Sequence, residues 1–129
     1  MSETKGIFKK LYEIQKMGLK YKKEAENPFY KSKYLSLDAL LEKLLPIAEE
    51  KNLLISHYGR DGYLITQVTD LDSDTYVDSA LPLPEGVDAQ KLGGAVTYFK
   101  RYNLGSLFNI VTDEDDDANG TISKDNDDF

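Results

Sequence analysis

Two short clusters of aromatic and basic residues could bind nucleic acid. Residues 29–34 read FYKSKY and residues 98–102 read YFKRY. Single-stranded nucleic acid needs cations along its phosphates and flat side chains against its bases, each stacked base contributing about 1–3 kcal/mol. Both clusters contain cations and aromatic rings. The candidates are Phe29, Tyr30, Lys31, Lys33 and Tyr34 in the first cluster and Tyr98, Lys100, Arg101 and Tyr102 in the second. The alternative is that the phenylalanines and some tyrosines are core residues and the cations are solvated charges.

An unbroken run of five acids, residues 113–117, follows the second cluster. Two-metal nuclease sites use carboxylates. Neighbouring side chains on one segment, however, point in different directions and cannot all converge on one ion. We therefore expect no metal site and no metal catalysis. The simplest interpretation is a solvated acidic exit from the domain, with weak divalent-ion binding as the alternative.

Other chemistry is sparse. The chain has no cysteine, which excludes disulfides, thiolate nucleophiles and thiolate zinc sites. Its single histidine, His57, lies in a strand-like run, where a packed or surface role is more common than catalysis. No phosphate-binding or dinucleotide-binding motif is present. The pair Gly93-Gly94 predicts the close approach of another backbone, with phosphate binding as the alternative. We predict no catalytic residue and no cofactor.

Charge is distributed unevenly along the chain. The net charge is −7, and residues 113–129 carry eight acids and one lysine. Residues 1–112 are balanced, yet residues 1–34 hold nine lysines against four glutamates. Such asymmetry is typical of nucleic-acid contact or of an interaction tail. We expect one domain over residues 1–112 and an acidic, disordered tail over residues 113–129.

Three helices and three strands must position these residues. Apolar spacing predicts helices over residues 5–23, 37–48 and 89–104, and β-rich runs predict strands over residues 53–58, 63–69 and 75–81. The sequence GRDG predicts a hairpin between the first two strands. The order α-α-β-β-β-α indicates a compact α+β domain with a three-stranded antiparallel meander packed against helices.

Local signals refine these elements. Ser36 and Asp88 are predicted N-caps. Pro46 lies inside the second helix and predicts a kink, or a helix that ends and restarts. A short apolar closing element is expected after Gly105.

With these motifs in place, the sequence resembles the ERF (essential recombination function) family of phage single-strand annealing proteins. The stretch NPFYKSKYLSLDALLEKLLPIAEEKNL resembles its first motif. The stretch QKLGGAVTYFKRYNLGSLFNIVTDEDDDAN resembles its second, a Gly-small-Ala-x-Thr-Tyr-x-x-Arg-Tyr-x-Leu helix followed by acids. The resemblance covers roughly residues 6–119. It implies binding of single-stranded DNA, pairing of complementary strands without ATP, and assembly into rings or filaments.

The resemblance also assigns residues. The positions that match the family motifs are Lys31, Lys33, Tyr34, Thr97, Tyr98, Arg101 and Tyr102. With Tyr30 and Lys100 from the two clusters, they form the predicted DNA site. Gly94 stands where the family often has serine. The family's core is thought to be β-β-β-α, which agrees with the order predicted from periodicity.

The last five residues, DNDDF, resemble the acidic end of bacterial single-strand-binding proteins. We predict partner binding by Asp125, Asp127, Asp128 and Phe129. The ring and free carboxylate of Phe129 would suit a basic-rimmed pocket, and the aspartates would steer the approach. The alternatives are an ordinary acidic terminus and a tail that competes with DNA for the protein's own site.

The leading hypothesis is therefore a phage-type recombination mediator that anneals single-stranded DNA and is not an enzyme. Its alternatives are a coating protein without annealing activity, and an interaction protein that recruits a host replication or repair factor through the acidic tip. A metal-dependent nuclease is the least favoured. Expected partners are single-stranded DNA, further copies of the chain, and a phage exonuclease or a host single-strand-binding or replication protein. No membrane partner is expected, and the expected location is the cytoplasm of a phage-infected or lysogenic bacterium.

Overall fold

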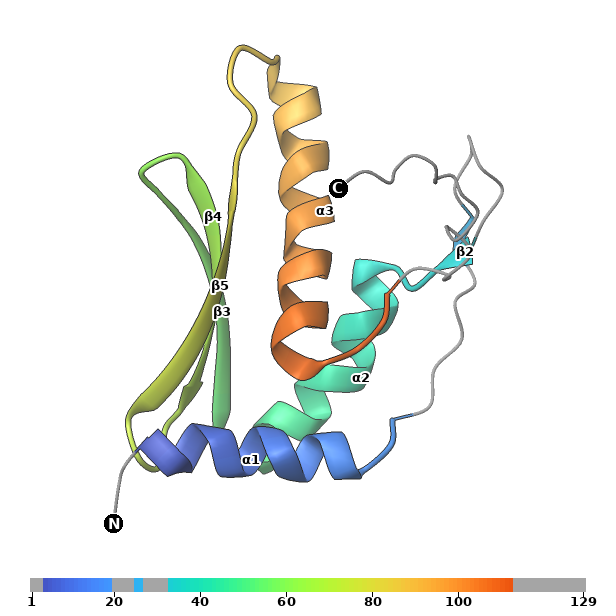
Figure 1. Cartoon of the computed structure of the whole chain (residues 1–129). Helices are drawn as coiled ribbons and strands as arrows, with labels where there is room; N and C mark the ends of the chain where they lie inside the picture. Colours follow the sequence, from blue (N-terminus) through green and yellow to red (C-terminus); the bar gives the residue numbers. More distant parts are fainter. Residues whose placement is uncertain (1–3, 20–24, 27–32, 113–129) are drawn as a thin grey trace, which may run out of the picture.

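The computed structural model describes residues 4–19, 25–26 and 33–112 (Figure 1). Its order is α-α-β-β-β-α, as predicted, with one small addition. The helices are α1 (Thr4–Lys16), α2 (Leu37–Glu50) and α3 (Ala89–Phe108), and the strands of the main sheet are β3 (Leu53–Arg60), β4 (Tyr63–Asp70) and β5 (Thr75–Pro82). The addition is an antiparallel pair of two-residue strands, β1 (Ala25–Glu26) and β2 (Lys33–Tyr34).

The main sheet is an antiparallel meander in the order β3-β4-β5. Arg60 pairs with Tyr63, so Asp61 and Gly62 alone form the β3–β4 turn. Their φ angles are 52° and 80°. A two-residue hairpin turn with two positive φ angles matches the twist of the flanking strands and favours Asp-Gly. The predicted hairpin is confirmed.

The helices pack against one face and the lower end of this sheet (Figure 1). Side chains alternate along β4, and every second one is buried: Leu64, Thr66, Val68 and Asp70. Val68 belongs to a hydrophobic core that includes buried residues of all three helices: Ile7 and Ile14 of α1, Leu40, Leu44 and Ala48 of α2, and Leu104 and Phe108 of α3. The other face leaves Leu54, Tyr63 and Tyr76 exposed.

The ends of the helices agree only in part with prediction. Ser36 and Asp88 are N-caps, and their side chains accept from the N–H groups of Ala39 and Lys91. The first helix is shorter than the predicted span over residues 5–23. It ends at Lys16, and Gly18 follows with φ 60°, a conformation that commonly ends helices.

Two predicted interruptions are absent from the described helices. α2 runs continuously through Pro46, so the predicted end and restart there is wrong. α3 continues through Gly105 to Phe108, where Asn109 closes it with φ 59°. Gly105 is a packing glycine, because a Cβ there would lie 2.9 Å from the carbonyl oxygen of Ile110. The prediction from sequence therefore placed the end of this helix too early.

Gly93 and Gly94 behave differently from the prediction of a close approach. No atom of the described chain lies within 4 Å of a Cβ built at either position. Both residues are exposed. The contact predicted for this pair is therefore not made within one described chain.

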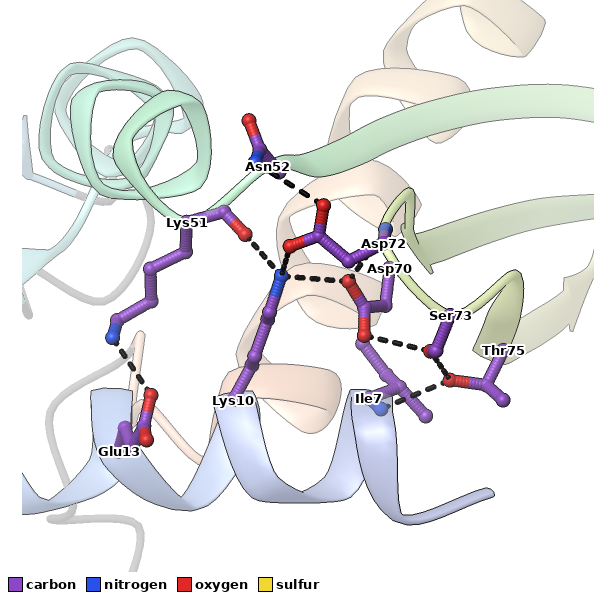
Figure 2. Close-up of polar contacts among 9 residues, drawn as sticks. All are labelled: Ile7, Lys10, Glu13, Lys51, Asn52, Asp70, Asp72, Ser73 and Thr75. Carbon is purple, nitrogen blue, oxygen red and sulfur yellow. Dashed lines mark hydrogen bonds and ion pairs between the residues drawn. The ribbon is translucent and has the colours of Figure 1, made fainter. Parts of the chain in front are cut away.

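A lysine from α1 ties the helix to the lower end of the sheet (Figure 2). The Nζ atom of Lys10 donates to Asp70 Oδ1 and to Asp72 Oδ2, both at 2.7 Å, and to the carbonyl oxygen of Lys51 at 2.5 Å. The Asp70 side chain is 2% exposed. Burial alone would lower the pKa of Lys10 and raise that of Asp70. Their hydrogen bonds outweigh burial, so the pKa of Lys10 is raised and that of Asp70 is lowered. Both groups are therefore charged at neutral pH.

The turn after β4 completes this set, which we call the Lys10–Asp70 network. Ser73 donates its hydroxyl to Asp70 Oδ2 at 2.7 Å, and the backbone N–H of Ile7 donates to Thr75 Oγ1 at 2.9 Å (Figure 2). Gly6 allows this approach, since a Cβ there would lie 2.7 Å from Asp70 Oδ2 and would also collide with Ser73. The network fixes the start of α1 on the β4–β5 turn.

A second polar group joins α3 to the sheet. Asn103 is fully buried; its amide donates to Thr66 Oγ1 at 3.1 Å and to the carbonyl oxygen of Leu64 at 3.3 Å. Its Oδ1 accepts from the Ser79 hydroxyl at 2.9 Å. Thr66 also contacts His57 Nδ1 at 2.8 Å. Because a buried amide is costly when left without partners, these bonds fix the register of α3 on the sheet.

Candidate nucleic-acid interface

Three tyrosine rings surround one arginine on the side of α3 that faces away from the sheet. The Arg101 guanidinium carbon lies 4.5 Å from the ring centroid of Tyr34, 4.9 Å from that of Tyr98 and 5.2 Å from that of Tyr102. All three distances fall within the range of a cation–π contact. We call these four residues the tyrosine–arginine cluster. It brings together one residue of the first sequence cluster and three of the second.

Helical spacing and a short strand assemble this cluster. Tyr98 and Tyr102 are four residues apart on α3 and are therefore neighbours on its surface. Their rings meet edge to face at 4.7 Å, and their hydroxyls are 3.0 Å apart. Tyr34 is the last residue of β2, and the next residue, the buried Leu35, donates its N–H to the carbonyl oxygen of Thr112 at 2.6 Å. That bond fixes β2 beside the end of the described chain.

Exposure differs sharply within the cluster. Arg101 is only 4% exposed, whereas Tyr98 is 45% exposed. Tyr34 and Tyr102 are intermediate. The arrangement therefore presents aromatic surface to the outside and keeps the guanidinium inside. This burial could not be read from the sequence, which treats Arg101 and Lys100 as equivalent cations.

Lys100 does not join the cluster. Two residues on a helix are about 200° apart around its axis, so Lys100 and Tyr98 point to nearly opposite sides. Lys100 lies near the sheet, close enough for its charge to affect His57. Burial first, and the charge of Lys100 second, lower the pKa of His57. The histidine is therefore neutral at pH 7, and the second sequence cluster divides between two faces of α3.

The remaining predicted residues have more limited descriptions. Thr97 is exposed on α3. Lys33 is described only as part of β2, and Tyr30 and Lys31 lie outside the described residues. The acid run and the tip residues Asp125, Asp127, Asp128 and Phe129 also lie outside them. The assignments to DNA and to a partner remain predictions.

The structure adds a set of side chains that the sequence clusters missed. Phe8, Tyr12 and Lys16 recur every four residues on α1 and are exposed, with Lys9 beside them. The spacing of aromatics opposite the buried Ile7 and Ile14 is the signal that could have revealed them. The lysines of this helix predicted a charged outer surface, but the aromatic residues between them were not considered as part of it.

The part of the chain that the structure describes offers neither a metal centre nor a membrane span. It contains no group of three or more histidine, cysteine, aspartate or glutamate residues that could hold a metal ion. None of its helices has both the length and the apolar character needed to cross a membrane.

Comparison with known proteins agrees with the resemblance seen in the motifs. A family model described as the ERF superfamily matches residues 7–128. The chain belongs to the ERF superfamily. The match covers both motif regions and continues beyond the acid run. No curated protein and no solved structure matches the chain. ERF membership supports a role related to phage recombination, and the geometry of the tyrosine–arginine cluster can now be considered within that role.

Proposed function

We propose that this ERF protein binds single-stranded DNA at the tyrosine–arginine cluster and promotes ATP-independent annealing of complementary strands. The observation that carries the proposal is the enclosure of Arg101 by three tyrosines, with the Tyr98 ring 45% exposed. Exposed rings held in fixed positions suit the stacking of bases without regard to their identity. An annealing protein needs this tolerance because it must accept any sequence.

The residues of the cluster have different roles in this proposal. Tyr98 stacks on a base, and Tyr102 supports it from the side. Arg101 holds the rings of Tyr34, Tyr98 and Tyr102 together and is a positioning residue. Lys31 and Lys33, close to Tyr34 in the sequence, supply cations to the phosphates.

The acid run offers a counterpart to this surface. The described residues end at Thr112, whose carbonyl oxygen accepts a hydrogen bond from the N–H of Leu35, next to Tyr34. Residues 113–117 follow directly in the sequence. Their negative charge would repel phosphates and weaken indiscriminate binding, which directs a strand toward the tyrosines. The proposed binding domain is thus residues 1–112, with residues 113–129 as an acidic tail.

Further copies of the chain are part of the proposal. Gly93 and Gly94 are exposed, and the described chain brings no atom close to their Cβ positions. A second copy could approach the α3 backbone closely there. Light scattering at micromolar concentration, with and without DNA, tests this assembly. A strictly monomeric mass in both conditions would contradict it.

Annealing and binding are measured separately. Two complementary labelled oligonucleotides should pair faster with the protein than without it, in the absence of ATP. Tyr98→Ala should weaken binding of a single strand by about 5-fold to 160-fold, the equivalent of one stacked base. Tyr98→Phe keeps the ring and should retain most of the affinity. Tyr76→Ala, which removes an exposed tyrosine from the open face of the sheet, is the matched control.

The alternatives give different results in the same experiments. A coating protein binds a single strand without accelerating pairing. A metal-dependent nuclease shortens the strand when magnesium is added. If Tyr98→Ala binds DNA as tightly as the wild type, the assignment of the stacking site is wrong.

The role of Arg101 is tested by salt dependence. Log affinity falls as log salt rises, and removing one cation that binds a phosphate of single-stranded DNA makes this slope shallower by about 0.7. Arg101→Ala should weaken binding with little change in slope, because it disorders the rings. Arg101→Lys should retain less ring packing than the wild type and show the same pattern in milder form. A slope that becomes shallower by about 0.7 in Arg101→Ala would instead identify Arg101 as a phosphate ligand.

A further inference from the structure

The outer face of α1 combines aromatic rings and cations that the fold does not use. Phe8 is 53% exposed and Tyr12 is 58% exposed. Lys9 and Lys16 are exposed beside them, and Lys16 Nζ lies 4.9 Å from the centroid of the Tyr12 ring. Residues 8, 12 and 16 are spaced four apart and share one face of the helix. They extend over about 12 Å of the helix axis.

The lysines on this face differ from Lys10 in that they form no ion pair among the described residues. The ion pairs formed among the described residues engage Lys10 with two aspartates and Lys51 with Glu13, and none of them engages Lys9 or Lys16. Glu13, the one acid of α1, is held by Lys51 at 2.9 Å. Lys51 lowers the pKa of Glu13 most, and the charges of Lys9 and Lys16 lower it to a lesser extent. This face therefore presents two exposed rings and two exposed lysines that form no ion pair among the described residues.

We propose that Phe8, Lys9, Tyr12 and Lys16 form a second surface for single-stranded nucleic acid, separate from the tyrosine–arginine cluster. Flat rings interleaved with cations match a polyanion that carries unstacked bases. This inference rests on the proposed function, since it adds a second strand contact to it. A protein that pairs two strands benefits from two such surfaces, because each strand can be held with its bases accessible.

The fold keeps the two surfaces apart. α1 lies across the lower end of the molecule, near the C-terminal end of α3 (Figure 1). Tyr98 lies ten residues before the end of α3, which corresponds to about 15 Å along its axis. The Lys10–Asp70 network holds α1 in this position through the opposite side of the helix (Figure 2). Substitutions on the outer face should therefore leave the network intact.

Two double variants of the full chain test the surface. Lys9→Gln with Lys16→Gln should lower the salt slope for a thymidine oligonucleotide by about 1.4, or about 0.7 for each phosphate that is no longer neutralised. Phe8→Ala with Tyr12→Ala should lower affinity by at least about 5-fold with little change in slope. Lys43→Gln on α2 and Tyr76→Ala on β5 are the matched controls and should change neither quantity. Thermal unfolding of each variant checks that it folds.

The possible results separate this inference from the proposed function. If the wild type and Tyr98→Ala differ in binding but both α1 variants bind as the wild type does, only the second surface is overturned. If the α1 variants change the mass in solution without DNA and leave affinity unchanged, the face is an interface between copies, and the inference is wrong. If the wild type does not bind single strands at all, both proposals fail.

Discussion

The two halves of α3 share one helix but differ in what surrounds them. None of residues 89–100 is buried, whereas residues 101–108 include Arg101, Asn103, Leu104, Gly105 and Phe108, all buried. The second half lies against the sheet and the other helices. The first half extends beyond α1 and α2, alongside the upper part of the sheet (Figure 1).

This difference separates the part of the helix that stabilises the domain from the part that is available to partners. A stretch of about 12 residues is a marginal helix in water by itself. Here it is stabilised by the Asp88 cap and by continuity with a packed second half. The tyrosine–arginine cluster lies at the boundary, with Tyr98 on the exposed side and Arg101 as the first buried residue. A rigid base beneath an exposed surface suits binding.

The largest expected effect concerns the packed end. Asp70→Asn should lower the free energy of unfolding by up to about 3–5 kcal/mol, because Lys10 would lose its buried charged partner and keep only the exposed Asp72 carboxylate. Urea unfolding measures this loss. Glu13→Gln is the control, since that pair is more exposed and should contribute little to stability. Equal losses for the two variants would show that the Lys10–Asp70 network is not a main support of this end.

The next effect compares the same substitution in the two halves of α3. Gly105→Ala should lower the free energy of unfolding by about 1–3 kcal/mol, because the new methyl group would lie against the Ile110 carbonyl and the Thr112 side chain. Thermal or urea unfolding detects it. A neutral or stabilising result would mean that residues 110–112 move away at little cost.

The opposite sign is expected in the exposed half. Gly94→Ala should raise the free energy of unfolding by about 0.4–1 kcal/mol, because alanine restricts the unfolded chain and its methyl group meets no atom of the described chain. The same variant tests assembly by light scattering. Greater stability with a smaller mass in solution would identify an interface between copies at this glycine.

The smallest effect depends on pH. The pKa of His57 is lowered by burial and by Lys100, so the folded state resists a proton that the unfolded state accepts. Stability should therefore be unaffected above about pH 6.5 and decline as the pH falls below that value. Unfolding between about pH 7 and pH 5 should show a shallow slope that His57→Gln reduces. An unchanged slope in that variant would assign the decline to other groups.

How much the sequence could predict also differs between regions. Local signals were reliable: Ser36, Asp88 and the Asp61–Gly62 turn determine conformation through their nearest neighbours. The helix end at Phe108 was missed because it involves tertiary contacts, such as those that place Gly105 against Ile110. The end at Lys16 was missed although it has a local signal, Gly18 with its positive φ angle. Pro46 was expected to kink its helix or to end and restart it; the helix continues through Pro46, with Leu40, Leu44 and Ala48 buried along it, so the second of these expectations is wrong.

The candidate site was predicted by residue type but not by direction. Tyr34, Tyr98 and Tyr102 do come together, although the first is far from the others in sequence. Lys100 and Arg101 point to different sides of α3 because successive residues of a helix are about 100° apart around its axis. Which of the two lies near the sheet depends on the side of α3 that packs against it. Composition alone does not contain that information. The exposed aromatics of α1 were missed because apolar periodicity predicts the buried side of a helix and says little about its outer face.

The main sheet has a further consequence for symmetry. No other described strand pairs with the outer edges of β3 and β5, each eight residues long. These two strands run in the same direction, because each is antiparallel to β4. Joining like edges would give an antiparallel seam and a closed twofold pair. Joining β3 of one molecule to β5 of the next would give a parallel seam that repeats, and its rotation per molecule would decide between a closed ring and an open helix.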